Sequence, residues 1–186
     1  MADGMLLAEL VDRCRGRNGP DFVVHGTIGD SIVSRAITLR SDEVEPGSVF
    51  GAVRGLRADG HDYVDEAVGR GAVAVIGEEV RTDLLPTLVA EQSPPLIGVA
   101  AAELNENPSA KLDLVGVTGT NGKTSIVTLV EHIATSAGRS ARSMGTLSGA
   151  LTTAAAPEFQ ASLRQAVDEG VTVFAAEVSS HALDQC

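Results

Sequence analysis

The sequence predicts an α/β protein in which a small N-terminal α/β domain, residues 1–108, precedes the first part of a second domain, residues 109–186, with a mostly parallel sheet. Continuous aliphatic runs bounded by Gly or Pro, such as residues 72–76 and 171–176, are typical of strands that are buried on both faces. These runs alternate with helical segments, which is the pattern of layered α/β folds. The polar, turn-like segment 105–109 separates the two series and marks the expected boundary.

In the first domain, residues 5–14 are expected to form a helix because Leu6, Leu7, Leu10 and Val11 share one face. Short runs rich in β-branched and aromatic residues predict strands at 22–24, 36–39, 49–53 and 72–76. The pattern favours helices at 61–69 and 82–91, and a buried apolar strand at 96–99.

In the second domain, a buried strand is expected at 112–117, followed by a Gly-rich loop. The pattern then predicts helices at 123–137 and 157–169 and strands at 141–144 and 171–176. The last strand would deliver Glu177 at its C-terminal end. A parallel α/β sheet of this kind normally needs more strands, and the chain ends soon after Glu177, so we expect a fragment or a truncated reading frame.

Composition narrows the class of protein. The formal net charge of −11 argues against nucleic-acid partners, which require clustered Lys and Arg. No apolar run approaches the length of about 18 residues that spans a membrane, and the acidic N-terminal segment is unlike a signal peptide. Cys14 and Cys186 lie in no CxxC or Cys/His cluster, so neither a zinc site nor a disulfide framework is expected. We therefore expect a cytoplasmic protein with an aliphatic core.

The strongest functional motif is the Gly-rich loop Gly119-Thr120-Asn121-Gly122-Lys123-Thr124, which follows a predicted strand and opens a predicted helix. Such a P-loop surrounds phosphates with backbone N–H groups at a helix N-terminus. The Lys123 ammonium would reach the β- and γ-phosphates, and the Thr124 hydroxyl suits Mg²⁺. The standard pattern has Gly where this chain has Val117, so the loop is a variant. The alternative, a Gly-rich turn with a chance Lys-Thr pair, is disfavoured by the flanking strand and helix.

Two further patterns lie downstream. Glu177 at a strand end would face the crevice where open α/β sheets bind ligands, and its carboxylate could complete a Mg²⁺ shell with Thr124. A glutamate at a strand end is by itself more often a surface residue, but its pairing with the Gly-rich loop favours a metal ligand. The string Ser179-Ser180-His181 lacks the GxSxG elbow of a hydrolase, so a catalytic triad is not expected. The pair Thr152-Thr153 could bind phosphate or sugar, or serve as turn residues.

Taken together, these residues resemble the Mur ligase family. The P-loop is followed by Glu177-Val178-Ser179-Ser180-His181-Ala182-Leu183, a string similar to the branch that adds a diamino acid. In the first domain, residues 38–50, 55–61 and 71–75 resemble the family's uridine-binding segments. The resemblance covers nearly the whole chain, from about residue 36 onward.

The resemblance implies a fold, a reaction and a set of site residues. The first domain would bind the UDP part of the substrate, and the second would bind ATP and Mg²⁺. The family activates the terminal carboxylate of UDP-MurNAc-L-Ala-D-Glu as an acyl phosphate, which the amine of meso-diaminopimelate or L-lysine attacks. The implied UDP and substrate contacts are Leu39, Ser41, Leu56, Arg57, Ala58, Thr152, Thr153, Ser179 and Gln185. The implied ATP contacts are Gly119, Thr120, Asn121, Gly122, Lys123, Thr124 and Ser125, with Lys123 catalytic and Thr124 and Glu177 as metal ligands.

The chain also departs from the family pattern. The uridine segment usually reads Asp-Ser-Arg, whereas Arg40-Ser41-Asp42 exchanges the charges; an ion pair across the loop is compatible with the exchange, although the flanking geometry would differ. Ala154 replaces a common Pro. The family's later parts lie beyond Cys186, so we expect no ligase turnover from these residues alone, and a monomer for the full-length enzyme. A non-catalytic nucleotide or UDP-sugar module, or degenerate paralogue, stays open; a folylpolyglutamate-synthase-like ligase is disfavoured.

Overall fold

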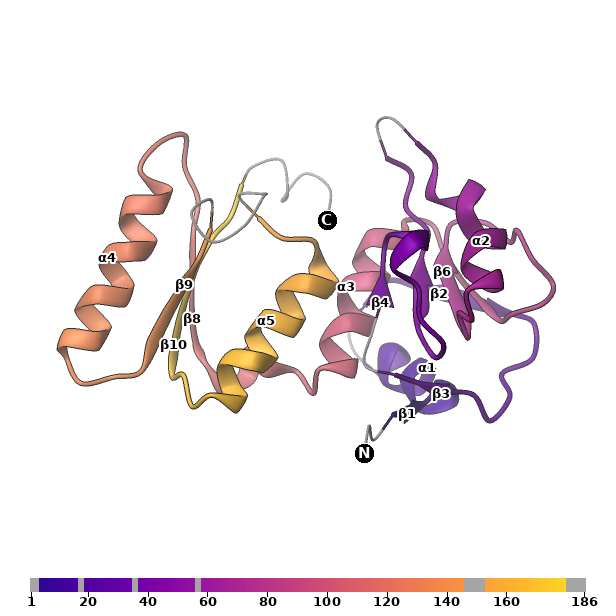
Figure 1. Ribbon diagram of the computed structural model, residues 1–186, viewed down its shortest axis with the longest axis horizontal. Coiled ribbons are helices and arrows are strands. Elements are labelled where there is room, and N and C mark those ends of the chain that lie inside the picture. Colours follow the sequence, from indigo (N-terminus) through magenta and orange to yellow (C-terminus); the bar gives the residue numbers. More distant parts are fainter. Residues whose placement is uncertain (1–3, 17–18, 35–36, 56–57, 146–152, 180–186) are drawn as a thin grey trace. The chain divides into compact units, whose positions relative to one another are not determined.

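The computed structural model describes residues 4–16, 19–34, 37–55, 58–145 and 153–179 of the chain (Figure 1). The chain divides into two compact units, Met1–Leu104 and Asn105–Cys186. Within the described part, none of the helices combines the length and apolarity needed to cross a membrane. The α/β fold class expected from the sequence is confirmed, and each unit is built on its own sheet.

The first unit is built on a five-stranded sheet with the order β2-β7-β6-β5-β4. Strands β4 to β7 run parallel, and β2 pairs antiparallel with β7 at one edge. The bounds are β2 Phe22–His25, β4 Ile37–Thr38, β5 Val49–Gly51, β6 Ala74–Gly77 and β7 Thr87–Ala90. Two further short strands, β1 Met5–Leu6 and β3 Ile32–Val33, pair antiparallel with each other and were not expected from the sequence.

Helices cover both faces of this sheet. Val49 and Ile76 pack on one face against α1 Leu7–Arg15 and α3 Ser93–Leu104. Phe50 and Val75, the alternate residues, pack on the other face against α2 Val64–Gly69. Because successive side chains of a strand point to opposite faces, the continuous apolar runs at β5 and β6 supply both cores at once. The first unit is therefore a three-layer α/β unit.

The structure corrects two sequence expectations in this unit. The helix expected at 82–91 is wrong, since Thr87–Ala90 forms β7, which pairs with β6 and β2 directly after Pro86. The strand expected at 96–99 is also wrong, because these residues belong to α3, which begins before Pro94 and Pro95. Its buried residues recur at helical spacing, namely Leu96, Ile97, Ala100, Ala101 and Leu104. Short apolar runs do not distinguish a buried strand from a buried helix.

The second unit is built on a three-stranded parallel sheet, ordered β8-β10-β9. The helices α4 and α5 lie on opposite sides of it (Figure 1). Phe174 of β10 is buried beneath α5, where its ring meets Phe159 edge-on at 6.4 Å between centroids. The bounds are β8 Asp113–Val117, α4 Lys123–Ser136, β9 Ala141–Met144, α5 Ala156–Asp168 and β10 Val173–Glu177.

Burial in the second unit differs from expectation at β8. All of β10 is buried, as expected for a strand with neighbours on both sides. The residues of β8 are exposed or half-buried, and Leu114 is 40% exposed. The expectation that this strand is buried is therefore wrong for the described sheet. The physical reason is position, since β8 is an edge strand there and α4 packs mainly over β9 and β10.

The remaining turns are short 3-10 helices. These are η1 Ser41–Glu43, η2 Gly60–Tyr63 and η3 Pro108–Lys111. η1 begins shortly after β4, and η2 follows the turn closed by Arg54 and Asp59 after β5; the candidate ligand-binding residues of the first unit lie in these two connections.

Candidate functional site

The Gly-rich loop of the second unit joins the end of β8 to the first turn of α4. Gly119 and Gly122 have positive φ angles of 144° and 81°, which explains why glycine occupies both positions. The Lys123 ammonium donates a hydrogen bond to the backbone oxygen of Gly119 over 2.8 Å. The lysine therefore folds back across the loop. A loop of this form offers backbone N–H groups, a helix N-terminus and a cation to a phosphate.

Glu177 lies beside the start of this loop. It is the last residue of β10 and pairs in register with Val117, the last residue of β8. The next backbone amide, that of Val178, donates to the Val117 oxygen over 2.8 Å. Only 3% of Glu177 is exposed. The expectation that a strand delivers this carboxylate to the carboxyl edge of the sheet is therefore confirmed.

Gly145, which the sequence analysis did not single out, holds the other side of Glu177. It directly follows β9, whose Met144 pairs with Ala176 of β10. A Cβ on Gly145 would overlap the side chain of Glu177, so only glycine allows the carboxylate to lie there. The signal in the sequence was a glycine immediately after a strand, and such a glycine often marks a close backbone approach.

Thr153, from the same connection between β9 and α5 as Gly145, also lies at this edge. Its hydroxyl oxygen accepts a hydrogen bond from the Ser179 amide over 2.9 Å and lies 3.2 Å from the backbone oxygen of Glu177, to which it donates. The two hydroxyl oxygens of Thr153 and Ser179 are 3.4 Å apart. The structure thus brings these two expected substrate residues together, next to Glu177.

The donor set at this edge suits a hard cation shared with phosphate. Nowhere in the described ranges do three His, Cys, Asp or Glu side chains gather as a metal cluster. One buried carboxylate and one threonine hydroxyl at the loop would leave the other ligand positions to phosphate oxygens and water. Mg²⁺ commonly binds proteins in this way.

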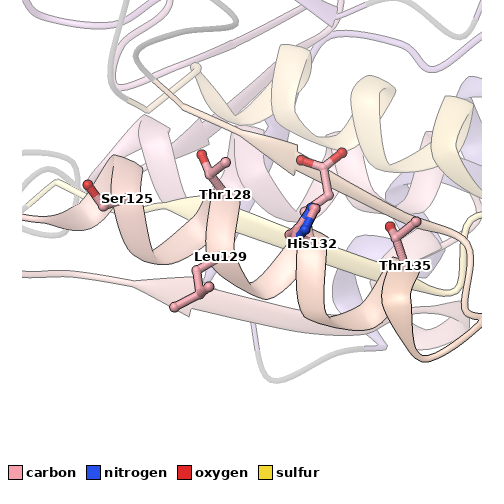
Figure 2. Close-up of a pocket in the computed structure, with 6 residues that line it drawn as sticks. Ser125, Thr128, Leu129, His132 and Thr135 are labelled. Atoms are coloured by element: carbon pink, nitrogen blue, oxygen red, sulfur yellow. The ribbon is translucent and has the colours of Figure 1, made fainter.

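A shallow cavity of about 520 Å³ runs along α4 from its first turn (Figure 2). All the residues labelled there come from this helix, and Ser125 is the only one that also belongs to the expected ATP-binding set. His132 and Thr135 line its far end. The cavity extends along the helix away from the loop, and Glu177 does not line it, so we assign the phosphate site to the loop and not to this cavity.

In the first unit, the expected uridine residues follow neighbouring parallel strands. Leu39 comes directly after β4, and its side chain packs against Gly51 of the neighbouring strand β5. A Cβ added to Gly51 would lie only 2.7 Å from Leu39 Cδ2. The Ser41 hydroxyl is largely buried and donates to the Glu66 carboxylate of α2 over 2.8 Å. Ser41 therefore joins η1 to α2 in this structure.

The exchanged charges around Ser41 form an ion pair. Arg40 contacts both carboxylate oxygens of Asp42, at 3.1 Å from Nε and 2.7 Å from Nη2. Hydrogen bonds from Arg40 hold the pKa of Asp42 below its ordinary value. Arg70 of the segment after α2 donates to the Asp42 backbone oxygen over 3.1 Å. The loop thus retains a pair across Ser41 despite the reversed order.

The turn after β5 carries the remaining described uridine residue, Ala58, which is exposed. Arg54 and Asp59 form an antiparallel bridge, and the Gly55 amide donates to the Ala58 oxygen over 3.0 Å. Four expected substrate residues, Leu56, Arg57, Thr152 and Gln185, lie outside the described residues, as do Ser180 and His181 of the discounted triad.

Comparison with known families covers most of the chain. The Mur ligase middle domain matches residues 117–186, and the catalytic domain of the Mur ligase family matches residues 34–111. The two matches meet near the division between the two units.

Curated relatives agree with these matches. A UDP-N-acetylmuramoyl-L-alanyl-D-glutamate–2,6-diaminopimelate ligase of Geobacillus thermodenitrificans is 38% identical over 175 residues, which are 89% of this chain and 35% of that protein. A UDP-N-acetylmuramyl-tripeptide synthetase of Deinococcus radiodurans is 38% identical over 162 residues, or 79% of this chain and 33% of that protein. The chain spans about a third of the length of the curated relatives it matches.

Solved structures show the same fold. A UDP-N-acetylmuramoyl-L-alanyl-D-glutamate–2,6-diaminopimelate ligase matches with a TM-score of 0.70 and 28% identity, over 81% of this chain and 33% of that one. The MurF ligase of Thermotoga maritima, solved in complex with ADP, matches with a TM-score of 0.57 and 27% identity, over 77% of this chain and 32% of that one.

Proposed function

Because the chain belongs to the Mur ligase family, we propose that it supplies the UDP-substrate-binding unit and the first part of the ATP-binding unit of an amide ligase. The ligase would join a diamino acid, meso-diaminopimelate or L-lysine, to UDP-MurNAc-L-Ala-D-Glu in the synthesis of peptidoglycan precursors. The full-length enzyme would act in the cytoplasm as a monomer.

One observation supports this proposal most strongly. The buried Glu177 carboxylate stands in register with the residue from which the Gly-rich loop departs. A phosphate-binding loop and a metal-binding carboxylate must lie close together to hold one Mg²⁺–nucleotide, and the adjacent strands β8 and β10 bring these two residues' strand ends side by side. In open α/β sheets, ligands bind outside these carboxyl ends.

Each residue of the second unit would then have a defined part. The loop amides and the N-terminus of α4 would hold the β- and γ-phosphates of ATP. Lys123 would leave the Gly119 oxygen and stabilise the negative charge that develops as the γ-phosphoryl group is transferred to the substrate carboxylate. Thr124 and Glu177 would hold Mg²⁺, which supplies further charge neutralisation when bound. Thr153 and Ser179 would contact the dipeptide end of the substrate beside Glu177.

The first unit would hold the UDP end of the same substrate. Leu39 and Ala58 lie after the carboxyl ends of β4 and β5, which are neighbours in a parallel sheet. Ser41 would support this edge through its bond to Glu66 and offer its remaining hydrogen-bonding capacity to the uridine. The Arg40–Asp42 ion pair would link the two residues that flank Ser41.

The chain offers a matched pair of variants for testing the nucleotide site, because it has only two lysines, Lys111 and Lys123. We expect Lys123→Ala to weaken ATP binding by about 10- to 100-fold, which corresponds to the loss of charge-assisted hydrogen bonds. Lys111→Ala, which removes only an exposed pair with Glu106, should bind ATP like the wild type. Calorimetry measures the ATP affinity of both variants, and equal affinities would contradict the assignment of this loop as a P-loop.

The substrate assignment has its own test. UDP-MurNAc-L-Ala-D-Glu at millimolar concentration should raise the melting temperature of the chain, because ligand binding to the folded state stabilises it. No shift would contradict a UDP-binding first unit. ATP binding without a UDP-substrate effect would favour the alternative, a nucleotide-binding module that no longer serves ligation.

A further inference from the structure

A buried histidine connects two strand ends at the uridine edge of the first unit. We propose that His61 is a positioning residue for UDP binding: its imidazole fixes Asp59, and through Asp59 the Arg54–Asp59 turn that carries Ala58. The inference rests on the proposed function, in that Ala58 is taken to contact the UDP moiety. His61 itself would touch no substrate, because only 2% of it is exposed.

The protonation of His61 follows from its neighbours. Its Nε2 accepts a hydrogen bond from the backbone amide of Glu78 over 2.9 Å. A backbone N–H can only donate, so Nε2 carries no proton, and the ring proton sits on Nδ1. Nδ1 then donates to the Asp59 carboxylate oxygen, 2.6 Å away. The ring is thus an ordered link from the end of β6 to Asp59.

Asp59 is the residue at which the turn closes. Its Oδ1 also accepts from the His61 amide over 3.0 Å, and Arg54 Nε lies 3.4 Å from its Oδ2. Arg54 and Asp59 pair across the turn, with the Gly60 amide donating to the Val53 oxygen over 2.9 Å just outside the pair. Ala58 directly precedes Asp59, so any rotation of the Asp59 backbone would move Ala58.

The imidazole of His61 is closely packed where it lies. A Cβ on Gly77 would lie 2.9 Å from His61 Nε2, and a Cβ on Gly60 would lie 2.7 Å from the Val53 amide nitrogen. Two glycines therefore admit the ring and the turn at close approach. A buried polar group that loses its partner is costly, so the link selects one arrangement of the turn. A satisfied core histidine that merely stabilises the unit would share this geometry, and the experiment must separate the two roles.

Two amide substitutions divide the functions of the ring. In His61→Asn the side-chain amide reaches the position of Nδ1 and can still donate to Asp59. In His61→Gln the amide reaches the position of Nε2 and can still accept from Glu78, but the link to Asp59 is lost. Both variants replace the imidazole ring with a smaller side chain, so both should reduce the packing around position 61 by similar amounts. Val11→Ala, on the buried face of α1, shows how a loss of stability alone affects UDP binding.

We would measure the affinity for UDP, the melting temperature and the hydrogen exchange of the Gly55 and Gly60 amides. His61→Asn should bind UDP within about threefold of wild type, and His61→Gln should bind about tenfold or more weakly. The two amides should exchange faster in the Gln variant than in the Asn variant. Equal UDP affinities in both variants, or losses that track the melting temperature as in Val11→Ala, would overturn the positioning role.

The same experiment separates this inference from the proposed function. If the wild-type chain does not bind UDP, the uridine assignment fails. The exchange rates then decide the role of His61 alone: faster exchange at Gly55 and Gly60 in the Gln variant only would keep it as the residue that fixes the turn, and equal exchange in both variants would overturn it.

Discussion

Replacing Gly145 with alanine is expected to displace the Glu177 carboxylate from the edge of the second unit. The added methyl group would overlap the outer atoms of the Glu177 side chain. The backbone itself should accept alanine, since Gly145 is not among the glycines with positive φ. The three atoms nearest to the added methyl group all belong to Glu177, and none belongs to the Gly-rich loop.

The size of the effect follows from this contact. Relieving an overlap of this kind costs about 1–3 kcal/mol if the surroundings must move. Rotation of Glu177 away from Gly145 would relieve the overlap, and it would remove a charged group from the proposed Mg²⁺ position. Interactions with a charged group contribute about 1.5–3 kcal/mol, so binding of MgATP should weaken by about 10- to 100-fold.

Calorimetry with MgATP and with ATP in EDTA separates the contribution of the metal to ATP binding from the contribution of the Gly-rich loop. Gly145→Ala should lose affinity for MgATP and keep its affinity for metal-free ATP within about threefold. Gly69→Ala is the matched control, because a Cβ there meets nothing within 4 Å. An unchanged MgATP affinity in Gly145→Ala would refute the reasoning, and an equal loss with and without metal would show that Gly145 supports the loop and not Glu177.

Three further outcomes are expected. Burial raises the pKa of Cys14 to about 12, so the thiol should stay protonated and resist iodoacetamide at neutral pH; peptide mapping that finds it alkylated as fast as in urea would contradict this. Phe174→Leu loses the edge-on contact with Phe159 and should destabilise the second unit by about 1–2 kcal/mol in urea titrations, and an unchanged midpoint would contradict that packing. Hydrogen bonds from the backbone and ring of His61 lower the pKa of Asp59 from its ordinary value of 3.8. The ionised Asp59 therefore stabilises the folded chain above pH 3.8, and this stabilisation is lost as the pH falls through the lower pKa of the folded state. In Asp59→Asn the melting temperature should fall less steeply with decreasing pH, and an equally steep fall would show that Asp59 is not responsible.

The fold was predictable where the spacing of apolar residues fits only one kind of secondary structure. Helix α1 and the strand that ends at Glu177 follow from periodicity and from a continuous run of suitable length. The stretch from Thr87 to Leu104 was not predictable, because short apolar runs fit both a strand and a buried helix. Only the pairing of β7 with β6 and β2 decides that Thr87–Ala90 is a strand.

The candidate site was predictable in its motifs and not in its contacts. The sequence correctly placed the Gly-rich loop between a strand and a helix and Glu177 at a strand end; their roles in binding phosphate and metal stay predictions. A glycine directly after a predicted strand was a signal at Gly145, but its contact with Glu177 could not be predicted, since that contact depends on β9 lying beside β10. The bonds of Ser41 to Glu66 and of His61 to Glu78 likewise join residues far apart in sequence, and spacing carries no information about them.

The central claim is that the Gly-rich loop and Glu177 form one MgATP site in this chain. The most direct test measures the affinity for ATP, with and without Mg²⁺, in the wild type and in Glu177→Gln. We expect Mg²⁺ to strengthen ATP binding by about tenfold in the wild type and to add nothing in the Gln variant, whose metal-free affinity should match the wild type. An equal gain from Mg²⁺ in both proteins, or no ATP binding by the wild-type chain, would contradict the account.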